Sequence, residues 1–132
     1  MLDPGDDPVD IAPEPLEGVP WTLISYIHKG QDDGVPEFME ITALFEADEE
    51  KVGAGSLSGS AGCNRYGGPY IAADGTIAFD RLAWTEMACA PEIMAHEMAF
   101  LGVMSSVTRY SATATRLTLS DDAGEESAIF RR

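Results

Sequence analysis

The fold class is decided by the stretch PEIMAHEMAFLGVMSS, residues 91–106. Pro91 can open a helix at its first turn, and Glu92 beside it complements the helix dipole. At about 100° per residue the large apolar side chains gather on one side, which is typical of a helix laid on a sheet. These side chains are Ile93, Met94, Phe100, Leu101, Met104 and Val107. The sequence predicts no other convincing helix.

The residues before this helix favour strands. Residues 21–27 alternate and are rich in β-branched and aromatic side chains, and residues 38–45 place alternate apolar side chains on one face. Residues 51–58 form a third strand weakened by glycine, and the glycines between 59 and 69 indicate a shaped loop. Asp74-Gly75 supplies the positive φ angles of a tight hairpin.

The residues after the helix predict three short strands, at 109–112, 116–120 and 127–131. Several strands, one helix and then more strands are typical of an α+β domain. We therefore expect a compact, curved antiparallel β-sheet covered by one main α-helix.

The 132-residue chain is long enough for one domain and too short for two ordinary ones. Its 23 acidic and 8 basic side chains give a net charge of -15, which repels nucleic acid and anionic lipid. Acidic residues and prolines crowd residues 1–18, so we expect a disordered tether there and a folded domain over residues 19–132.

The chain start gives a hypothesis about location. No stretch approaches the roughly 20 apolar residues that cross a bilayer, and the first residues lack the pattern of a signal peptide. Met1 to Asp10 is more typical of a mature segment behind an added initiator methionine. We therefore expect a soluble domain that was exported and is held through its N-terminus.

Three motifs carry a family resemblance: GCNRYGGPY at residues 62–70, LAWTEMAC at 82–89 and EMAFL at 97–101. Together with Trp21, Tyr110 and the closing strands, they resemble the META domain, or HslJ-like, family over about residues 19–131. Trp84 and Glu86 depart from the usual pattern around the second motif. Glu86 makes this side of the molecule more acidic, which disfavours an anionic ligand here.

The resemblance implies a barrel-like sheet with a helix, found in cell-envelope and lipoprotein-type proteins linked to heat shock and stress tolerance. It implies no enzymatic activity. The expected location is therefore periplasmic or otherwise extracytoplasmic, with a lipid anchor in the native precursor as one form of attachment. A similar fold in secretin pilot lipoproteins, which bind acyl chains, suggests a hydrophobic ligand by analogy of fold alone.

Cys63 and Cys89 are the two cysteines of the chain, one in each of its two most irregular segments. This placement predicts a disulfide, which suits an oxidising compartment. Two buried free thiols remain the alternative. Zinc is disfavoured because the two histidines, His28 and His96, do not lie at ligand spacing from either cysteine. His96 falls on the solvent side of the helix, which argues against a base for a cysteine nucleophile.

Glu97 falls in the middle of the apolar stripe of the helix. A buried carboxylate needs partners, so we expect hydrogen bonds from loop groups near the cysteine motifs, or a pair with Arg65 or Arg81.

These features favour a non-catalytic envelope domain, without metal or cofactor and expected to be a monomer, that binds another envelope component in stress tolerance or assembly. Asn64, Arg65 and Tyr66 could display a recognition surface, although shaping of the loop is the stronger interpretation. The alternative is a carrier of a lipid or other apolar ligand in a pocket between sheet and helix. The pocket would be lined by Met94, Met98, Leu101 and Met104.

Overall fold

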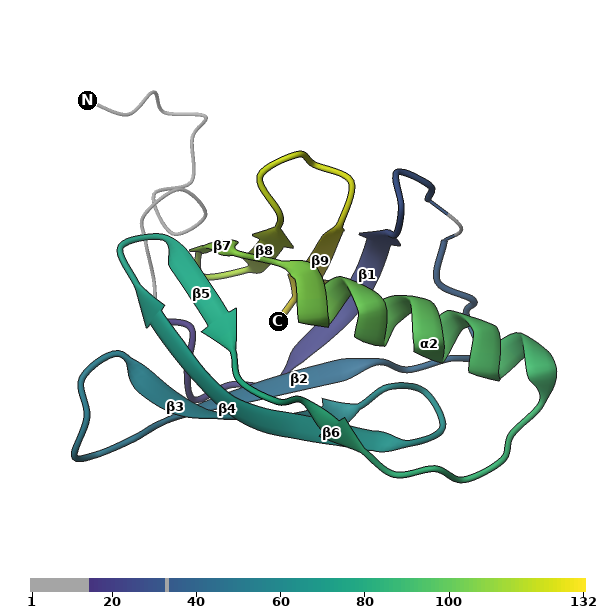
Figure 1. Cartoon of the computed structure of the whole chain (residues 1–132), viewed down its shortest axis with the longest axis horizontal. Coiled ribbons are helices and arrows are strands. Elements are labelled where there is room, and N and C mark those ends of the chain that lie inside the picture. Colours follow the sequence, from purple (N-terminus) through teal and green to yellow (C-terminus); the bar gives the residue numbers. More distant parts are fainter. Residues whose placement is uncertain (1–14, 33) are drawn as a thin grey trace.

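The computed structural model describes residues 15–32 and 34–132. Within these residues, nine strands form one antiparallel sheet in the order β3-β2-β1-β9-β8-β7-β5-β4-β6. Strand β3 also pairs with β4, which closes the sheet into a barrel and leaves β6 outside the closed ring. The α+β class and the curved antiparallel sheet under a helix are confirmed (Figure 1).

Short strands build the barrel, and four of their connections have four residues or fewer. Their bounds are β1 (Trp21–Ile27), β2 (Thr42–Ala47), β3 (Ala54–Ser60), β4 (Arg65–Ala73), β5 (Thr76–Phe79), β6 (Ala83–Trp84), β7 (Arg109–Ala112), β8 (Arg116–Ser120) and β9 (Ser127–Arg131). The last three strands have the bounds that the sequence predicts. The predicted hairpin is also present, with φ of 53° at Asp74 and 82° at Gly75 between β4 and β5.

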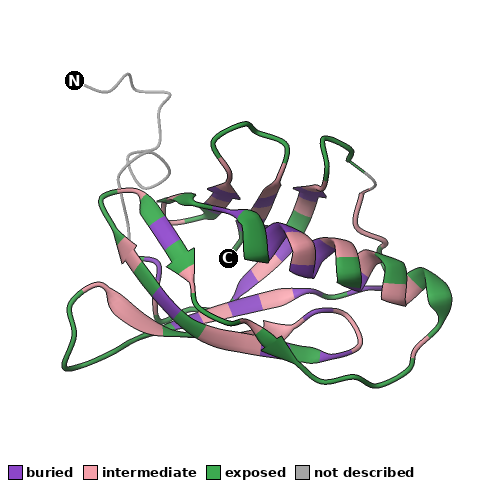
Figure 2. Cartoon of the chain, viewed as in Figure 1, coloured by how far each residue is buried: buried purple, intermediate pink, exposed green. Residues whose placement is uncertain are grey.

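Helix α2 (Pro91–Ser106) packs against β1, β8 and β9, and one of its faces is buried while the other is exposed (Figure 2). Its start has Pro91 and Glu92 in the first turn and no side-chain cap. Its fully buried side chains are Glu97, Phe100, Leu101, Val103 and Met104. Among the described residues, no helix is long and apolar enough to cross a membrane.

The aromatic side chains of the core join the helix to opposite walls of the barrel. The Phe100 ring lies 5.4 Å from the ring of Tyr66 on β4 and 6.2 Å from that of Phe130 on β9, both edge-on. Phe45 of β2 meets Tyr70 of β4 edge-on at 5.3 Å. Such pairs add about 0.5–1.5 kcal/mol beyond the area that they bury.

The glycine-rich run at residues 59–69 differs from the prediction, because β4 begins at Arg65 and runs through Gly67, Gly68 and Pro69. A side chain at Gly67 would collide with the carbonyl of Leu57 on β3, and one at Gly59 with that of Thr42 on β2. The glycines therefore allow close approach of strands that bend around the barrel. Strands β2 and β3 also begin later than expected, at Thr42 and Ala54.

The packed part of the chain begins before residue 19. Leu16 is only 3% exposed, and its carbonyl accepts a hydrogen bond from the Trp21 indole at 3.0 Å. The Tyr70 hydroxyl donates to Glu17 at 2.6 Å; burial and this bond raise the pKa of Tyr70. The predicted tether ends at residue 18, but residues 16–18 already belong to the folded domain. The buried Leu16 side chain and the hydrogen-bonded Glu17 carboxylate anchor them there. Residues 1–14 of the predicted tether lie outside the described residues.

This anchoring gives a testable expectation. Leu16→Ala should lower the free energy of unfolding by about 2–3 kcal/mol, because it removes a buried side chain without refilling the space. The exposed neighbour Val19 is the control, and Val19→Ala should change it by less than about 0.5 kcal/mol. Urea denaturation of both variants measures the difference. Equal midpoints for the two would show that Leu16 does not contribute to the core.

Candidate functional site

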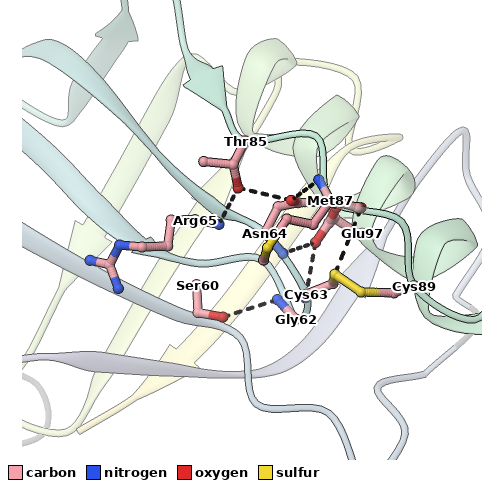
Figure 3. The surroundings of a disulfide bond; sticks show 9 residues. All are labelled: Ser60, Gly62, Cys63, Asn64, Arg65, Thr85, Met87, Cys89 and Glu97. Atoms are coloured by element: carbon pink, nitrogen blue, oxygen red, sulfur yellow. Dashed lines mark hydrogen bonds between the residues drawn. A yellow bond between two sulfur atoms is a disulfide. The ribbon is translucent and has the colours of Figure 1, made fainter.

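The most heavily cross-linked part of the molecule lies where three segments meet (Figure 3). They are the loop between β3 and β4, the extended segment between β6 and α2, and the second turn of α2. Neither the loop nor the extended segment is a regular strand or helix, so sheet and helix hydrogen bonds do not join them. Side chains make these connections instead.

The Cys63–Cys89 disulfide joins the loop to the residues that lead into α2, with Cα atoms 6.4 Å apart. The predicted bridge is therefore present, and the free-thiol alternative is not the state of this structure. Sulfur atoms bonded to each other cannot serve as thiolate nucleophile or zinc ligand. The described residues contain no cluster of His, Cys, Asp and Glu that could hold a metal.

Glu97 is 1% exposed, and its carboxylate is held entirely by N–H groups. One oxygen, Oε2, accepts hydrogen bonds from the backbone N–H of Cys63 at 3.0 Å and of Asn64 at 2.7 Å. The other, Oε1, accepts from the Asn64 side-chain amide at 2.6 Å. This is the first of the two arrangements that the sequence predicts. Such charge-assisted bonds compensate for the loss of water around the carboxylate.

Asn64 connects all three segments. Its amide nitrogen donates to Glu97 and, at 3.2 Å, to the carbonyl of Met87. Its amide oxygen accepts from the Thr85 hydroxyl at 2.8 Å and from the backbone N–H of Met87 at 2.7 Å. The side chain therefore uses both donors and both acceptor positions, which fixes its orientation. No substitution offers the same set.

The proposed recognition residues separate into two groups. Asn64 is 1% exposed and Tyr66 4%, and the Tyr66 hydroxyl donates to the carbonyl of Thr42 at 2.7 Å inside the barrel wall. Burial raises the pKa of Tyr66, which therefore stays protonated. Only Arg65 faces solvent. The Glu97 network turns Asn64 inward and strand alternation turns most of Tyr66 inward, so these two side chains shape the loop and the barrel wall.

The four residues proposed to line an apolar pocket do not share one environment. Met98 is 53% exposed, whereas Leu101 and Met104 are buried in the packed core and Met94 is half-buried. The four side chains therefore point into different surroundings and do not line one cavity. The reason is that the buried face of α2 is centred near Phe100 and Met104, whereas Met94 and Met98 lie beyond its edge on the helical circumference.

The two histidines have structural partners. His96 is half-buried, and its Nδ1 atom forms a hydrogen bond of 2.7 Å with the Tyr26 hydroxyl. His28 forms a 2.8 Å contact with Glu126. The His96 side chain therefore points toward β1, and its hydrogen bond to Tyr26 ties α2 to that strand.

Sequence reasoning missed one feature of this junction. The segment 83–88 is exposed throughout, and its first two residues pair with Tyr66 and Gly67 as strand β6. A shallow surface depression of about 380 Å³, widely open to solvent, lies beside these paired residues. It is lined by Arg65, Tyr66, Gly67, Ala83, Trp84 and Thr85. Two residues are too few to show alternation, so no signal in the sequence could have found this strand.

The geometry first defines a class: a small antiparallel β-barrel in which a strand-connecting loop is joined by a disulfide to the residues before the covering helix and by a buried carboxylate to the helix itself. The chain belongs to the META domain family, whose family model matches residues 14–132. Comparison with curated proteins finds no match.

Two solved structures are similar. The NMR structure of a protein from Burkholderia xenovorans has 26% sequence identity and a TM-score of 0.71, covering 100% of this chain and 98% of its own. The crystal structure of a DUF4847 family protein from Bacteroides vulgatus has 14% identity and a TM-score of 0.54, covering 85% of this chain and 90% of its own. The second likeness shows the fold alone.

Proposed function

We propose that this domain is a non-catalytic binding module of the cell envelope, which holds another envelope component during stress or assembly. Its place is the periplasm or another extracytoplasmic compartment. Membership of the META family supports the envelope setting. The disulfide supports the compartment, because such bonds persist where the medium is oxidising.

The observation that carries the proposal is the shallow, open depression along β6, which we call the groove and assign to binding. Trp84 is 38% exposed there beside the exposed Arg65, and tryptophan and arginine are the residues that most often dominate binding energy. Strand β6 pairs with β4 alone, so within the described chain its other edge is open. An open edge beside an aromatic side chain suits an extended peptide segment that adds as a strand.

The groove is held in shape before any partner arrives. Thr85 donates its backbone N–H to the carbonyl of Arg65 at 3.0 Å, and its hydroxyl is bound to Asn64. Met87 is fixed by both amide atoms of Asn64, and the segment ends at the disulfide. Such anchoring reduces the entropy that binding would otherwise cost. A fixed groove is therefore the part of this surface best prepared for recognition.

The test is site-specific photo-crosslinking in intact envelopes. A crosslinking amino acid replaces Met87, which is 55% exposed and lies two residues after Thr85 of the groove, or Val52, which is fully exposed in the β2–β3 turn. We expect a discrete adduct from position 87 that disappears when Trp84→Ala is added, and none from position 52. The same adducts from both positions, or none from position 87, would contradict the proposal.

A further inference from the structure

The outer face of β8 and β9 carries a charge opposite to that of the chain as a whole. Two of the 8 basic residues, Arg116 and Arg131, lie on this face, and a third, Arg132, directly follows β9, in a chain of net charge -15. Arg116 and Arg131 are direct cross-strand partners in the register, and both are exposed. None of the three forms an ion pair with the described residues.

Two like charges directly opposite each other destabilise an antiparallel pair. A third strand on the same face shows the usual solution, because Arg109 of β7 pairs with Asp122 at 2.7 Å. The chain has 23 acidic side chains, so a shortage of carboxylates does not explain why Arg116 and Arg131 lack an acidic partner. The cause is local: among the described residues, no acidic side chain is placed beside them. An anion from outside would remove the repulsion.

The third arginine is fixed at the edge of the same hairpin. The Arg132 guanidinium lies 4.0 Å from the centre of the Trp21 ring and donates to the carbonyls of Ala114 at 3.0 Å and Thr113 at 3.2 Å. These bonds hold the β7–β8 turn and keep a positive charge beside it. The turn therefore has a defined shape and a positive field.

A hollow of about 340 Å³ lies against this turn and contains hydroxyl groups as well as a guanidinium. It is lined by Ser111, Thr113, Thr115, Arg116 and Thr118. Ser111 and Thr118 face each other across the β7–β8 ladder, and within the described chain their hydroxyls make no hydrogen bond to protein. Two free hydroxyl donors next to a guanidinium are suited to the oxygens of a tetrahedral anion.

We propose that this hollow, the oxyanion site, binds a phosphate-type group. The Arg116 guanidinium donates to two of its oxygens, the hydroxyls of Ser111 and Thr118 donate to others, and Arg131 adds charge from across the ladder. The site is independent of the groove along β6, because the two share no lining residue. The group belongs to a small phosphorylated molecule or to a lipid headgroup.

The first experiment is a titration of the full chain with inorganic phosphate, followed by amide NMR shifts at constant ionic strength. We expect saturable shifts at residues 111–118. Arg116→Gln with Arg131→Gln should weaken binding by at least about tenfold, since it removes a charge-assisted pair. Arg109→Gln is the matched control on the same face and should leave the affinity within about twofold. Equal weakening in the control, or shifts that sodium chloride reproduces, would overturn the site.

The second experiment distinguishes the sources. The same chain is sedimented with vesicles of phosphatidylglycerol and phosphatidylcholine, or of phosphatidylcholine alone. Phosphate binding together with sedimentation on the first vesicles, reduced in the double variant, indicates a headgroup. Phosphate binding without sedimentation indicates a soluble phosphorylated molecule. Sedimentation that the double variant retains, without phosphate shifts, contradicts the site.

Discussion

Replacing Cys63 and Cys89 together with serine should lower the free energy of unfolding by about 3–4 kcal/mol. The bridge spans a sequence separation of 26 residues, and closing a loop of that size removes conformational entropy from the unfolded chain. For a domain whose total stability is about 5–15 kcal/mol, this is a large fraction. Both positions are half-buried, so serine can be accommodated, and we expect the variant to keep its fold. Urea denaturation of the oxidised protein and of the variant measures the difference.

Reduction of the wild-type chain provides the control. The reduced protein should unfold at the same urea concentration as the serine variant, because both lack the same constraint. Thiol titration of the unfolded, unreduced protein should find no free thiol. Two free thiols, or a variant within about 1 kcal/mol of the oxidised chain, would falsify the assignment of a stabilising bridge.

Replacing Glu97 with leucine should cost about 3–5 kcal/mol, although leucine suits the apolar stripe of the helix. The substitution leaves three N–H donors, from the backbones of Cys63 and Asn64 and from the Asn64 amide, without their acceptor in a buried place. Glu97→Gln should cost less, about 1–2 kcal/mol, because the glutamine oxygen can still accept from both backbone groups. The NH₂ group of the new glutamine would face the NH₂ group of Asn64, and two donors cannot form a hydrogen bond with each other.

The exposed Glu92 in the first turn of α2 supplies matched controls. Glu92→Leu and Glu92→Gln should each change the free energy of unfolding by less than about 1 kcal/mol, the size of a helix-dipole interaction. Adding Asn64→Asp to Glu97→Gln restores a donor–acceptor pair between the side chains, so the two costs should not add. Additive costs, or a leucine variant as stable as the glutamine variant, would refute the network as a stabilising element.

Helices and turns could be predicted from the sequence where residues close together in the chain determine them. Helix α2 follows from the spacing of its apolar residues and from Pro91, and the β4–β5 hairpin follows from Asp74-Gly75. The partners of Glu97 were also predictable in kind, because a carboxylate in an apolar stripe requires donors wherever they come from. Which donors they are was not, since Cys63 and Asn64 are 34 and 33 residues away.

The glycines at residues 59–69 show most clearly where prediction from local sequence fails. Judged by their own propensity, the glycines at residues 59–69 indicate a loop. In the closed barrel they allow β4 to lie close to its neighbour β3. Propensity measures what a residue does to its own backbone, whereas Gly67 is required by the carbonyl of another strand. This difference explains why the sequence predicts a loop at residues 59–69, where the structure has the start of β4.

By itself, the sequence determined the α+β class, the helix and the closing strands, because periodicity and turn chemistry act within a few residues. Only the tertiary structure decided the closure of β3 on β4, the inward turn of Asn64 and Tyr66, the docking of Leu16 under Trp21, and the meeting of Arg116 with Arg131. Each of these depends on the register between segments far apart in the chain. Register is set by the packing of the whole barrel, which no local pattern contains.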